Sequence, residues 1–250
     1  MLLLPTYRHG TWATHVIAAI TDIVVVPDDV DIVQLAMVGI NPMTAVLMLR
    51  NYGDPSMPDR WIGQTAGNSA VGEYLIKLAH RFGWKTVSVV RREAAAEQVR
   101  RWGGDRVVVD DSNLESNLAQ SLSDTELDIV VDSIGGRAAR QLVHHLRFGG
   151  TLVSYAVLSG QTDSADVLFD LIGRHVNWTG FWETNWLHRT DTALVHSAYR
   201  DLLALVADGT LSARVDRTVR LEDWKDVVSL TQSNTGREGK VVFVCDEQPS

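Results

Sequence analysis

The chain has 250 residues, of which 45% are hydrophobic and 22% are charged, and its formal net charge is −8. This composition is typical of a globular protein that is large enough to bury a substantial core. Because acidic residues outnumber basic ones and no lysine- or arginine-rich block interrupts them, we expect no nucleic-acid binding through a basic face.

The single cysteine, Cys245, excludes a disulfide framework within the chain and a zinc site built from several thiolates. No apolar run reaches the roughly 18–20 residues that span a bilayer. The apolar start, Met1 to Leu4, ends at Pro5 and lacks the basic leader of a signal peptide. We therefore expect a soluble, cytoplasmic protein that does not bind membranes.

The first 60 residues combine an extended segment with one helix. Residues 11–27 are rich in β-branched side chains and close on Pro27, which predicts extended chain. Asn41-Pro42 is a good helix start and Gly53 a good helix stop, so a helix is expected over Pro42–Tyr52.

From Trp61 onward, strand and helix patterns alternate. Strands are expected at "WIGQTA", "TVSVV", "RVVVD", "LDIVVD", "TLVSYAVL" and "HVNWTGFW", and helices at "VGEYLIKLAHRFG", "AAAEQVRRWGG" and "RAARQLVHHLRFGG". The continuous apolar strands are of the kind found when both faces of a sheet are covered. This βαβ series predicts an α/β fold with a doubly wound parallel sheet of the Rossmann type.

The last 60 residues depart from this alternation. A long helix is expected over Asp191–Ala207, closed by Asp208-Gly209, and it is followed by the strand "RVDRTVRL", the helix "EDWKDVVSLTQ" and the strand "GKVVFVC". These pieces need not belong to the parallel sheet. We therefore expect a second, smaller substructure that joins the tail to the first 40 residues.

A glycine-containing turn links the first predicted strand of the sheet to its helix. Gly67 and Gly72 bracket this turn, and the residues between and beside them are small. Free N–H groups at a helix start, together with the helix dipole, stabilise a pyrophosphate, and small residues let the backbone approach it. The pattern is not a strict G-x-G-x-x-G, so a purely structural tight turn is the alternative to dinucleotide binding.

The second strand ends in Val90-Arg91-Arg92. A site for NAD usually has an acidic residue at this point, which binds the ribose hydroxyls. Two arginines instead offer forked, charge-assisted hydrogen bonds to a 2′-phosphate, which favours NADPH over NADH. The alternative is a solvated basic start to the next helix, and the neighbouring Glu93 weakens the phosphate interpretation.

Two other reductase signatures are missing from the sequence. Tyr74 and Lys77 have the wrong spacing for the Tyr-x-x-x-Lys pair of short-chain dehydrogenases. The adjacent His144 and His145 point to different faces of a helix and make a poor pair of metal ligands. We therefore expect no metal site.

Several motifs together resemble one family. They are "GTWATHV", "INPMTAVLML", "NSAVG", "VVRR", "DSIGG", "FGGTLVSYAVLSG" and "GFWETNW". The chain resembles the mitochondrial-type trans-2-enoyl-thioester reductases, a zinc-free branch of the medium-chain dehydrogenase/reductases. The motifs cover essentially the whole chain in family order. The glycine turn and "DSIGG" are common to many medium-chain reductases, whereas "NP-x-T-A" and "GFW…W" are more specific to the enoyl reductases.

The resemblance implies cofactor-binding roles for particular residues. Asn41 matches an asparagine that reaches the nicotinamide, and Lys240 matches a late lysine that contacts the cofactor. Phe181 and Trp182 match a segment near the nicotinamide and substrate. The remaining matches lie in the pyrophosphate turn, the adenosine-phosphate contact and a loop along the cofactor: Gly67, Asn68, Ser69, Ala70, Val71, Gly72, Arg91, Arg92, Tyr155, Ala156, Val157 and Leu158.

Each of these roles has a simpler alternative. Asn41 can serve only as a helix cap, Phe181 and Trp182 can pack in the core, and Lys240 can be a solvated lysine.

The resemblance also implies a domain division. Residues 41–209 match the Rossmann dinucleotide-binding domain, and residues 1–40 with 210–250 match remnants of a GroES-like, β-rich catalytic domain. A piece of about 80–100 residues, the size of a small domain, has no counterpart in this sequence. The family tyrosine that donates a proton or orients the substrate lies in that piece, and Tyr7 is not its counterpart. No catalytic residue is therefore predicted.

The expected chemistry is NADPH-dependent reduction of the C=C bond of 2-enoyl thioesters of CoA or acyl carrier protein, with hydride added to the β-carbon. Activity of this chain alone is in doubt, because the first part of the catalytic domain has no counterpart. An NADPH:quinone reductase of the same superfamily and a non-catalytic nucleotide-binding remnant are the alternatives. The resemblance also implies a homodimer through the sheet edge at "HVNWTGFW".

Overall fold

The computed structural model describes residues 1–161, 166–232 and 239–245. The chain divides into two compact units: unit 1 is Met1–Met43 with Glu183–Ser250, and unit 2 is Thr44–Trp182. Residues 183–209, expected in the dinucleotide-binding domain, thus group with unit 1. That unit 1 is a remnant of a GroES-like domain stays a prediction.

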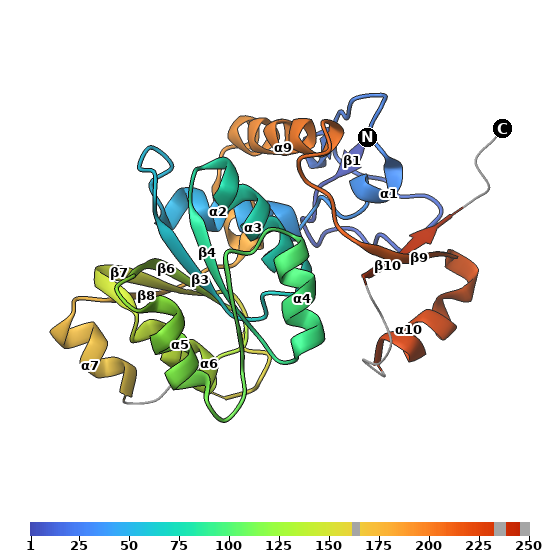
Figure 1. Ribbon diagram of the computed structural model, residues 1–250. Coiled ribbons are helices and arrows are strands. Elements are labelled where there is room, and N and C mark those ends of the chain that lie inside the picture. The colour runs from blue at the N-terminus through green and yellow to red at the C-terminus, as the bar shows by residue number, and fades with distance from the viewer. Residues whose placement is uncertain (162–165, 233–238, 246–250) are drawn as a thin grey trace. The chain divides into compact units, whose positions relative to one another are not determined.

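Unit 2 is built around a sheet of six parallel strands (Figure 1). From one edge to the other they are β5 (Arg106–Val109), β4 (Lys85–Val90), β3 (Trp61–Gln64), β6 (Leu127–Asp132), β7 (Leu146–Ser154) and β8 (Asn177–Gly180). This order confirms the predicted doubly wound sheet. We call the side of the sheet at which its parallel strands end the carboxyl edge. Because the winding direction reverses between β3 and β6, a crevice is expected at this edge between these two strands.

Helices cover both faces of this sheet (Figure 1). They are α2 (Asn41–Tyr52), which the unit boundary divides, α3 (Ala70–Arg81), α4 (Glu93–Arg101), α5 (Leu114–Leu122), α6 (Gly136–Val143) and α7 (Asp166–Gly173). Apolar residues of α3 and α4 form one buried cluster, including Ile76 and Val99. Those of α5 and α6 form another, including Leu118 and Leu142. The two layers of apolar side chains explain why the strands are apolar on both faces.

Two details of unit 2 differ from the sequence-based expectation. The helix expected across "RAARQLVHHLRFGG" ends at Val143, and Leu146 already begins β7. The reason is that Leu146 is fully buried and pairs with Leu127 across a register shift in the sheet. The helices α5 and α7 were not anticipated from the sequence.

The described residues of unit 1 form two small sheets and four helices. β1 (Leu2–Leu3) pairs antiparallel with β2 (Ile23–Val24), and β9 (Val215–Arg220) pairs parallel with β10 (Lys240–Val244). The helices are α1 (Ile32–Leu35), α8 (Glu183–Arg189), α9 (Thr192–Ala207) and α10 (Trp224–Gln232), and short 3₁₀ turns span Ile20–Asp22 and Leu221–Asp223. The expected C-terminal strands and long helix are present, and Asp191 caps α9 by accepting a hydrogen bond from the Ala193 N–H.

The extended segment expected over residues 11–27 is mostly not a strand. Only Ile23 and Val24 pair with another strand, and Ile20 lies in a 3₁₀ turn. Ile17 is 95% exposed and Ile20 is 81% exposed. β-branched residues favour strands because they pack on a pleated surface, and these two side chains have no such surface to cover.

Several contacts connect distant parts of unit 1, among them a paired hydrogen bond and a contact between two rings. The Gln34 side chain donates to the Ala213 carbonyl and accepts from the Ala213 N–H, at 3.1 and 2.9 Å. The Trp12 and Phe243 rings pack edge to face with centroids 4.9 Å apart. Neither unit contains, in its described residues, a helix that is both long and apolar enough to cross a membrane.

Candidate cofactor site at the carboxyl edge of the sheet

The turn between β3 and α3 is closely packed, and both of its glycines are sterically required. The Gly67 N–H donates to the Val89 carbonyl of β4 at 3.1 Å, and a Cβ at Gly67 would lie 2.6 Å from the Ser88 Cβ. A Cβ at Gly72 would lie 2.4 Å from the Gly67 carbonyl oxygen. Any larger residue at either position would push the turn away from the sheet or from its own helix.

The same turn presents unpaired backbone donors. Ser69 caps α3, and its hydroxyl accepts a hydrogen bond from the Gly72 N–H at 3.1 Å. Within the described residues, the N–H groups of Asn68, Ala70 and Val71 have no hydrogen-bond acceptor. Three free donors at the positive end of a helix dipole form a site that favours an anion such as a pyrophosphate.

A buried network ties this turn to the strand on its other side. The Thr65 hydroxyl donates to the Asp132 carboxylate at 2.6 Å and accepts from the Ser133 N–H at 3.0 Å. The same carboxylate accepts from the N–H groups of Ile134 and Gly135, each at 3.0 Å. The network fixes the ends of β3 and β6 against each other at the point where the winding direction reverses. Sequence reasoning noted "DSIGG" as a motif but missed this role of Thr65 and Asp132.

Arg91 and Arg92 follow β4 at the same edge, and both are exposed. Neither guanidinium forms a hydrogen bond or ion pair with another residue in the described part of the chain. Glu93, which weakened the phosphate interpretation, accepts a hydrogen bond from Arg100 at 2.7 Å. The carboxylate is thus occupied within α4, and the two arginines are available to an anionic ligand.

The Tyr155–Leu158 segment follows β7 and runs beside the segment that follows β6. The Tyr155 N–H donates to the Asp132 carbonyl and the Leu158 N–H to the Ser133 carbonyl, both at 2.9 Å. Tyr155 is half-buried, and burial raises the pKa of its phenol. The phenol therefore stays protonated and able to donate a hydrogen bond. Val157 and Leu158 are exposed.

Phe181 and Trp182, which follow β8, differ in exposure. Phe181 is buried and packs edge to face against Tyr52, with ring centroids 6.3 Å apart. Core packing, the simpler alternative for this residue, is therefore observed. Trp182 is 62% exposed and is accessible to a ligand.

The expected site residues fall into two groups. The turn Gly67–Gly72, the arginines, the Tyr155–Leu158 segment and Trp182 all follow strands of one sheet at its carboxyl edge, within unit 2. Asn41 is the first residue of α2 and Lys240 the first of β10, and both belong to unit 1. Their roles stay predictions.

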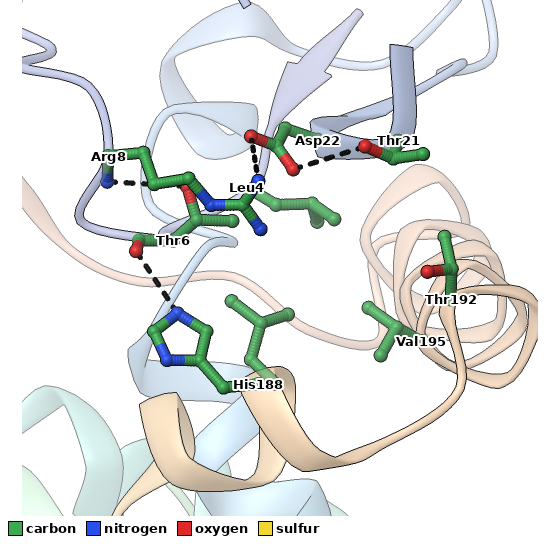
Figure 2. A pocket seen from close by; sticks show the side chains of 9 residues that line it. Leu4, Thr6, Arg8, Thr21, Asp22, His188, Thr192 and Val195 are labelled. Atoms are coloured by element: carbon green, nitrogen blue, oxygen red, sulfur yellow. Dashed lines mark hydrogen bonds and ion pairs between the residues drawn. The ribbon is translucent and has the colours of Figure 1, made fainter. Parts of the chain in front are cut away.

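A cavity of about 120 Å³ lies within unit 1 (Figure 2). Its polar lining includes Asp22, whose buried carboxylate contacts Arg8 and His9, and His188, which hydrogen-bonds the Thr6 carbonyl. Ligand pockets are typically about 300–1,000 Å³, so this cavity is too small for a dinucleotide. In unit 2, an open hollow of about 380 Å³ runs along β5, lined in part by Val107, Val108 and Val109.

Unit 1 also holds a buried acid next to a buried phenol. The Tyr199 hydroxyl lies 2.7 Å from the Gly39 carbonyl and 2.9 Å from a Glu183 carboxyl oxygen. A hydroxyl has one proton, and only the carboxyl of these two acceptors can carry a proton of its own. The Tyr199 hydroxyl can therefore donate to either oxygen, and donation to the Glu183 carboxylate favours the ionised form of that acid. Burial outweighs this effect and raises the pKa of Glu183 to about 7, and burial also raises the pKa of Tyr199.

No group of three or more His, Cys, Asp or Glu side chains in the described residues could hold a metal ion. The donor set of a zinc site is thus missing from that part of the chain.

Comparison with known proteins places these features in a family. Residues 70–207 match the family model described as zinc-binding dehydrogenase. The mitochondrial enoyl-[acyl-carrier-protein] reductase of Xenopus tropicalis is 29% identical over 90% of this chain and 66% of its own length. The human enzyme of the same name is 26% identical over 88% of this chain and 60% of its own length. The chain thus spans less than two thirds of these curated relatives.

Solved structures support the same placement. A candidate NADPH:quinone reductase from Bacillus thuringiensis superposes with a TM-score of 0.84 at 26% identity, covering 94% of this chain and 71% of its own. A mutant enoyl thioester reductase from Candida tropicalis has a TM-score of 0.79 at 22% identity, covering 94% of this chain and 70% of its own. The second likeness concerns the fold alone.

The relatives correct one expectation. The cytoplasmic location predicted from the sequence is contradicted, since the enoyl reductases that the chain matches are mitochondrial proteins.

The parallel sheet in the doubly wound order, the glycine turn with its free donors and a family match over residues 70–207 agree, and the chain belongs to the zinc-binding dehydrogenase family, within the enoyl-reductase-like medium-chain dehydrogenase/reductases.

Proposed function

We propose that this protein is an NADPH-dependent oxidoreductase that reduces the C=C bond of 2-enoyl thioesters. The observation that carries the cofactor assignment is the pair of arginines, Arg91 and Arg92, which have no partner among the residues that the structure describes. They lie at the edge that also holds the N–H groups of Asn68, Ala70 and Val71, which have no acceptor among those residues either. The likeness to mitochondrial enoyl-[acyl-carrier-protein] reductases supports the substrate class and a place in fatty acid metabolism.

Each part of the carboxyl edge has a defined task in this proposal. The turn Gly67–Gly72 binds the pyrophosphate through its backbone donors, and Arg91 with Arg92 binds the 2′-phosphate. Tyr155, Ala156, Val157 and Leu158 lie along the dinucleotide. Within unit 2, Phe181 and Trp182 form the nicotinamide side, Phe181 by supporting the exposed Trp182. When bound, NADPH supplies the hydride that adds to the β-carbon of the thioester.

The reaction we propose does not use zinc. Hydrogen-bond donors can stabilise the negative charge that develops on a thioester oxygen during reduction. We assign no residue of this chain as the proton donor.

A quinone reductase is the second candidate function. It is favoured by the overlap with the Bacillus thuringiensis structure, which has a TM-score of 0.84 at 26% identity. The two candidates share the cofactor edge and differ only in what approaches the nicotinamide.

The test is a set of parallel assays on the 250-residue chain. NADPH oxidation is followed with crotonyl-CoA, with a crotonyl acyl carrier protein and with a quinone, and NADPH binding is measured separately by titration. Faster turnover of an enoyl thioester supports the proposal, and faster turnover of the quinone supports the second candidate. Binding without turnover of any acceptor indicates a non-catalytic nucleotide-binding protein, and absence of NADPH binding rejects all three.

We also propose a homodimer formed through β8. This strand is the outer strand of the six-stranded sheet, and its Trp178 is 43% exposed. The preceding helix α7 exposes Phe169 and Ile172, at 81% and 77%. Unpaired edges and exposed apolar faces are liabilities in a monomer. Sedimentation of the wild type and of Gly180→Pro tests this, because Phe181 donates to Ser154 of β7 and the neighbouring Gly180 N–H therefore points to the open side of β8. A dimer that Gly180→Pro dissociates is the expected result.

A further inference from the structure

Arg137, in the first turn of α6, joins two segments that are distant in the sequence. Its guanidinium forms an ion pair with the Asp110 carboxylate and donates to the Asp111 carbonyl at 2.7 Å. Asp110 and Asp111 directly follow β5, whereas α6 follows β6. The contact thus links the segment after the outermost strand to the helix that starts near the middle of the sheet.

The position of this link places it beside the proposed cofactor edge. In the sheet, β4 and β3 lie between β5 and β6. The Asp110 N–H donates to the Val90 carbonyl at 2.7 Å, so Asp110 is held directly beside the residue that precedes Arg91. A dinucleotide whose 2′-phosphate binds Arg91 and Arg92 must place its adenosine within reach of the segment that follows β5.

The ion pair itself has little value for stability. The Arg137 side chain is 45% exposed and the Asp110 side chain 25% exposed. Ion pairs exposed to this extent are typically worth about 0–1 kcal/mol. The Asp110 carboxylate and the Asp111 carbonyl nevertheless both accept from Nη2 of Arg137, and these two bonds hold the flat face of the guanidinium in one orientation. A planar, oriented and partly exposed guanidinium is suited to stacking on an aromatic ring.

We infer that Arg137, oriented by Asp110, stacks on the adenine ring of the bound dinucleotide. This inference rests on the proposed NADPH function and assigns the base contact that the glycine turn and the two arginines leave open. Arg91 and Arg92 recognise the phosphate on the ribose, whereas Arg137 recognises the base.

The test uses two ligands that differ only in the base. Adenosine 2′,5′-bisphosphate carries adenine, and methyl ribofuranoside 2,5-bisphosphate keeps both phosphates and lacks it. Calorimetric titration gives the ratio of their dissociation constants for the wild type, for Arg137→Ala and for Arg137→Lys. Lysine can still pair with Asp110 but has no planar face, so it keeps the link between the segments while removing the stacking surface.

We expect both variants to bind the adenosine ligand about 10-fold more weakly, with little change for the ligand that lacks the base. Arg174→Ala is the matched control, because Arg174 pairs with Asp170 at 2.8 Å in another partly exposed ion pair of unit 2. It should leave both affinities unchanged. An equal loss for both ligands, or wild-type affinity in Arg137→Lys, would overturn the base contact while the cofactor proposal stands. If the wild type binds neither ligand nor NADPH, the cofactor proposal fails, and the inference fails with it.

Discussion

Unit 2 and unit 1 differ in how completely each buries its own apolar surface. Unit 2 has a six-stranded sheet whose two faces are covered, and side chains such as Val87, Leu118 and Ala96 are fully buried. Unit 1 has two two-stranded sheets and leaves Ile17 95% exposed. A two-stranded sheet is marginally stable by itself, so the small sheets of unit 1 depend on the helices and contacts around them, whereas unit 2 has one large sheet at its core.

Because of this difference, functional roles can be assigned to residues of unit 2 with little dependence on unit 1. The proposed pyrophosphate, phosphate and base contacts all lie in unit 2, and most of residues 70–207, the family match, lies there too. Asn41 and Lys240, which the resemblance relates to the nicotinamide side, lie in unit 1. Variants in unit 2 should therefore change cofactor binding, and variants in unit 1 should change stability first.

The largest effect is expected for Gly72→Ala in unit 2. The new Cβ would lie 2.4 Å from a backbone oxygen, so the turn must move away from the geometry that presents its donors. We expect NADPH to bind about 100-fold more weakly, equivalent to about 2.7 kcal/mol. Fluorescence titration measures this change. Gly173→Ala is the control, since nothing lies within 4 Å of a Cβ there, and unchanged binding in Gly72→Ala would contradict the pyrophosphate role.

In unit 1, Glu183 should make stability depend on pH. Its pKa is about 7 in the folded protein against a usual 4.5, so the folded state holds the proton more tightly. The resulting stabilisation is complete below pH 4.5 and is lost as the pH rises through about 7. Glu183→Gln keeps a neutral hydrogen-bonding group and should remove this slope, which makes it more stable than the wild type at pH 8.5 by about 2–3 kcal/mol.

Urea unfolding at pH 5, 7 and 8.5 measures this difference. Glu97→Gln, at an exposed position of α4, is the control and should retain the wild-type slope. Parallel pH profiles for the wild type and Glu183→Gln would show that Glu183 is ionised throughout.

Within unit 2, Arg91→Ala and Arg92→Ala test whether these arginines select NADPH over NADH. Each removes charged hydrogen bonds to the 2′-phosphate and should weaken NADPH binding by about 1.5–3 kcal/mol. NADH lacks that phosphate, so its affinity should change little and the preference for NADPH should fall. Arg101→Ala, which removes an exposed arginine at the other end of α4, serves as the control. A preference that stays the same in both variants rejects NADPH selection by these arginines.

The smallest effect is expected for Trp12→Ala in unit 1. Trp12 packs edge to face on Phe243, and such pairs are worth about 0.5–1.5 kcal/mol beyond the area they bury. We expect a loss of that order in the free energy of unfolding and no change in NADPH affinity. Trp12→Phe, which keeps a ring, should lose less. A loss of NADPH affinity without a loss of stability would contradict the expectation that variants in unit 1 change stability first.

The sequence predicted unit 2 better than unit 1 for a physical reason. Apolar strands and glycine stops are local signals, and in unit 2 a large sheet lets the local preference prevail. The helix α5 could also have been found, because Leu114, Leu118 and Leu122 recur every four residues and are all buried. The segment over residues 11–27 has equally strong β preference, but it lacks a surface to pack on and remains mostly irregular.

The candidate site could be predicted from the sequence only where its residues are neighbours in the chain. The glycine turn and the arginine pair follow from neighbouring residues, and both positions were predicted. The links between Thr65 and Asp132 and between Arg137 and Asp110 depend on which strands are neighbours in the sheet. The burial of Phe181 against Tyr52 likewise requires tertiary structure. A resemblance transfers residue roles, but it does not reveal which side chains share a hydrogen-bond network.

The network around Asp132 has a kinetic consequence. With its carboxylate already occupied by Thr65, Ile134 and Gly135, the crevice is shaped before any nucleotide arrives. A ligand that meets a preorganised surface needs no slow rearrangement on entry, so association should be fast and similar among variants. Differences in affinity would then appear mainly as differences in residence time, and stopped-flow dissociation becomes the most sensitive measure of how each contact holds the cofactor.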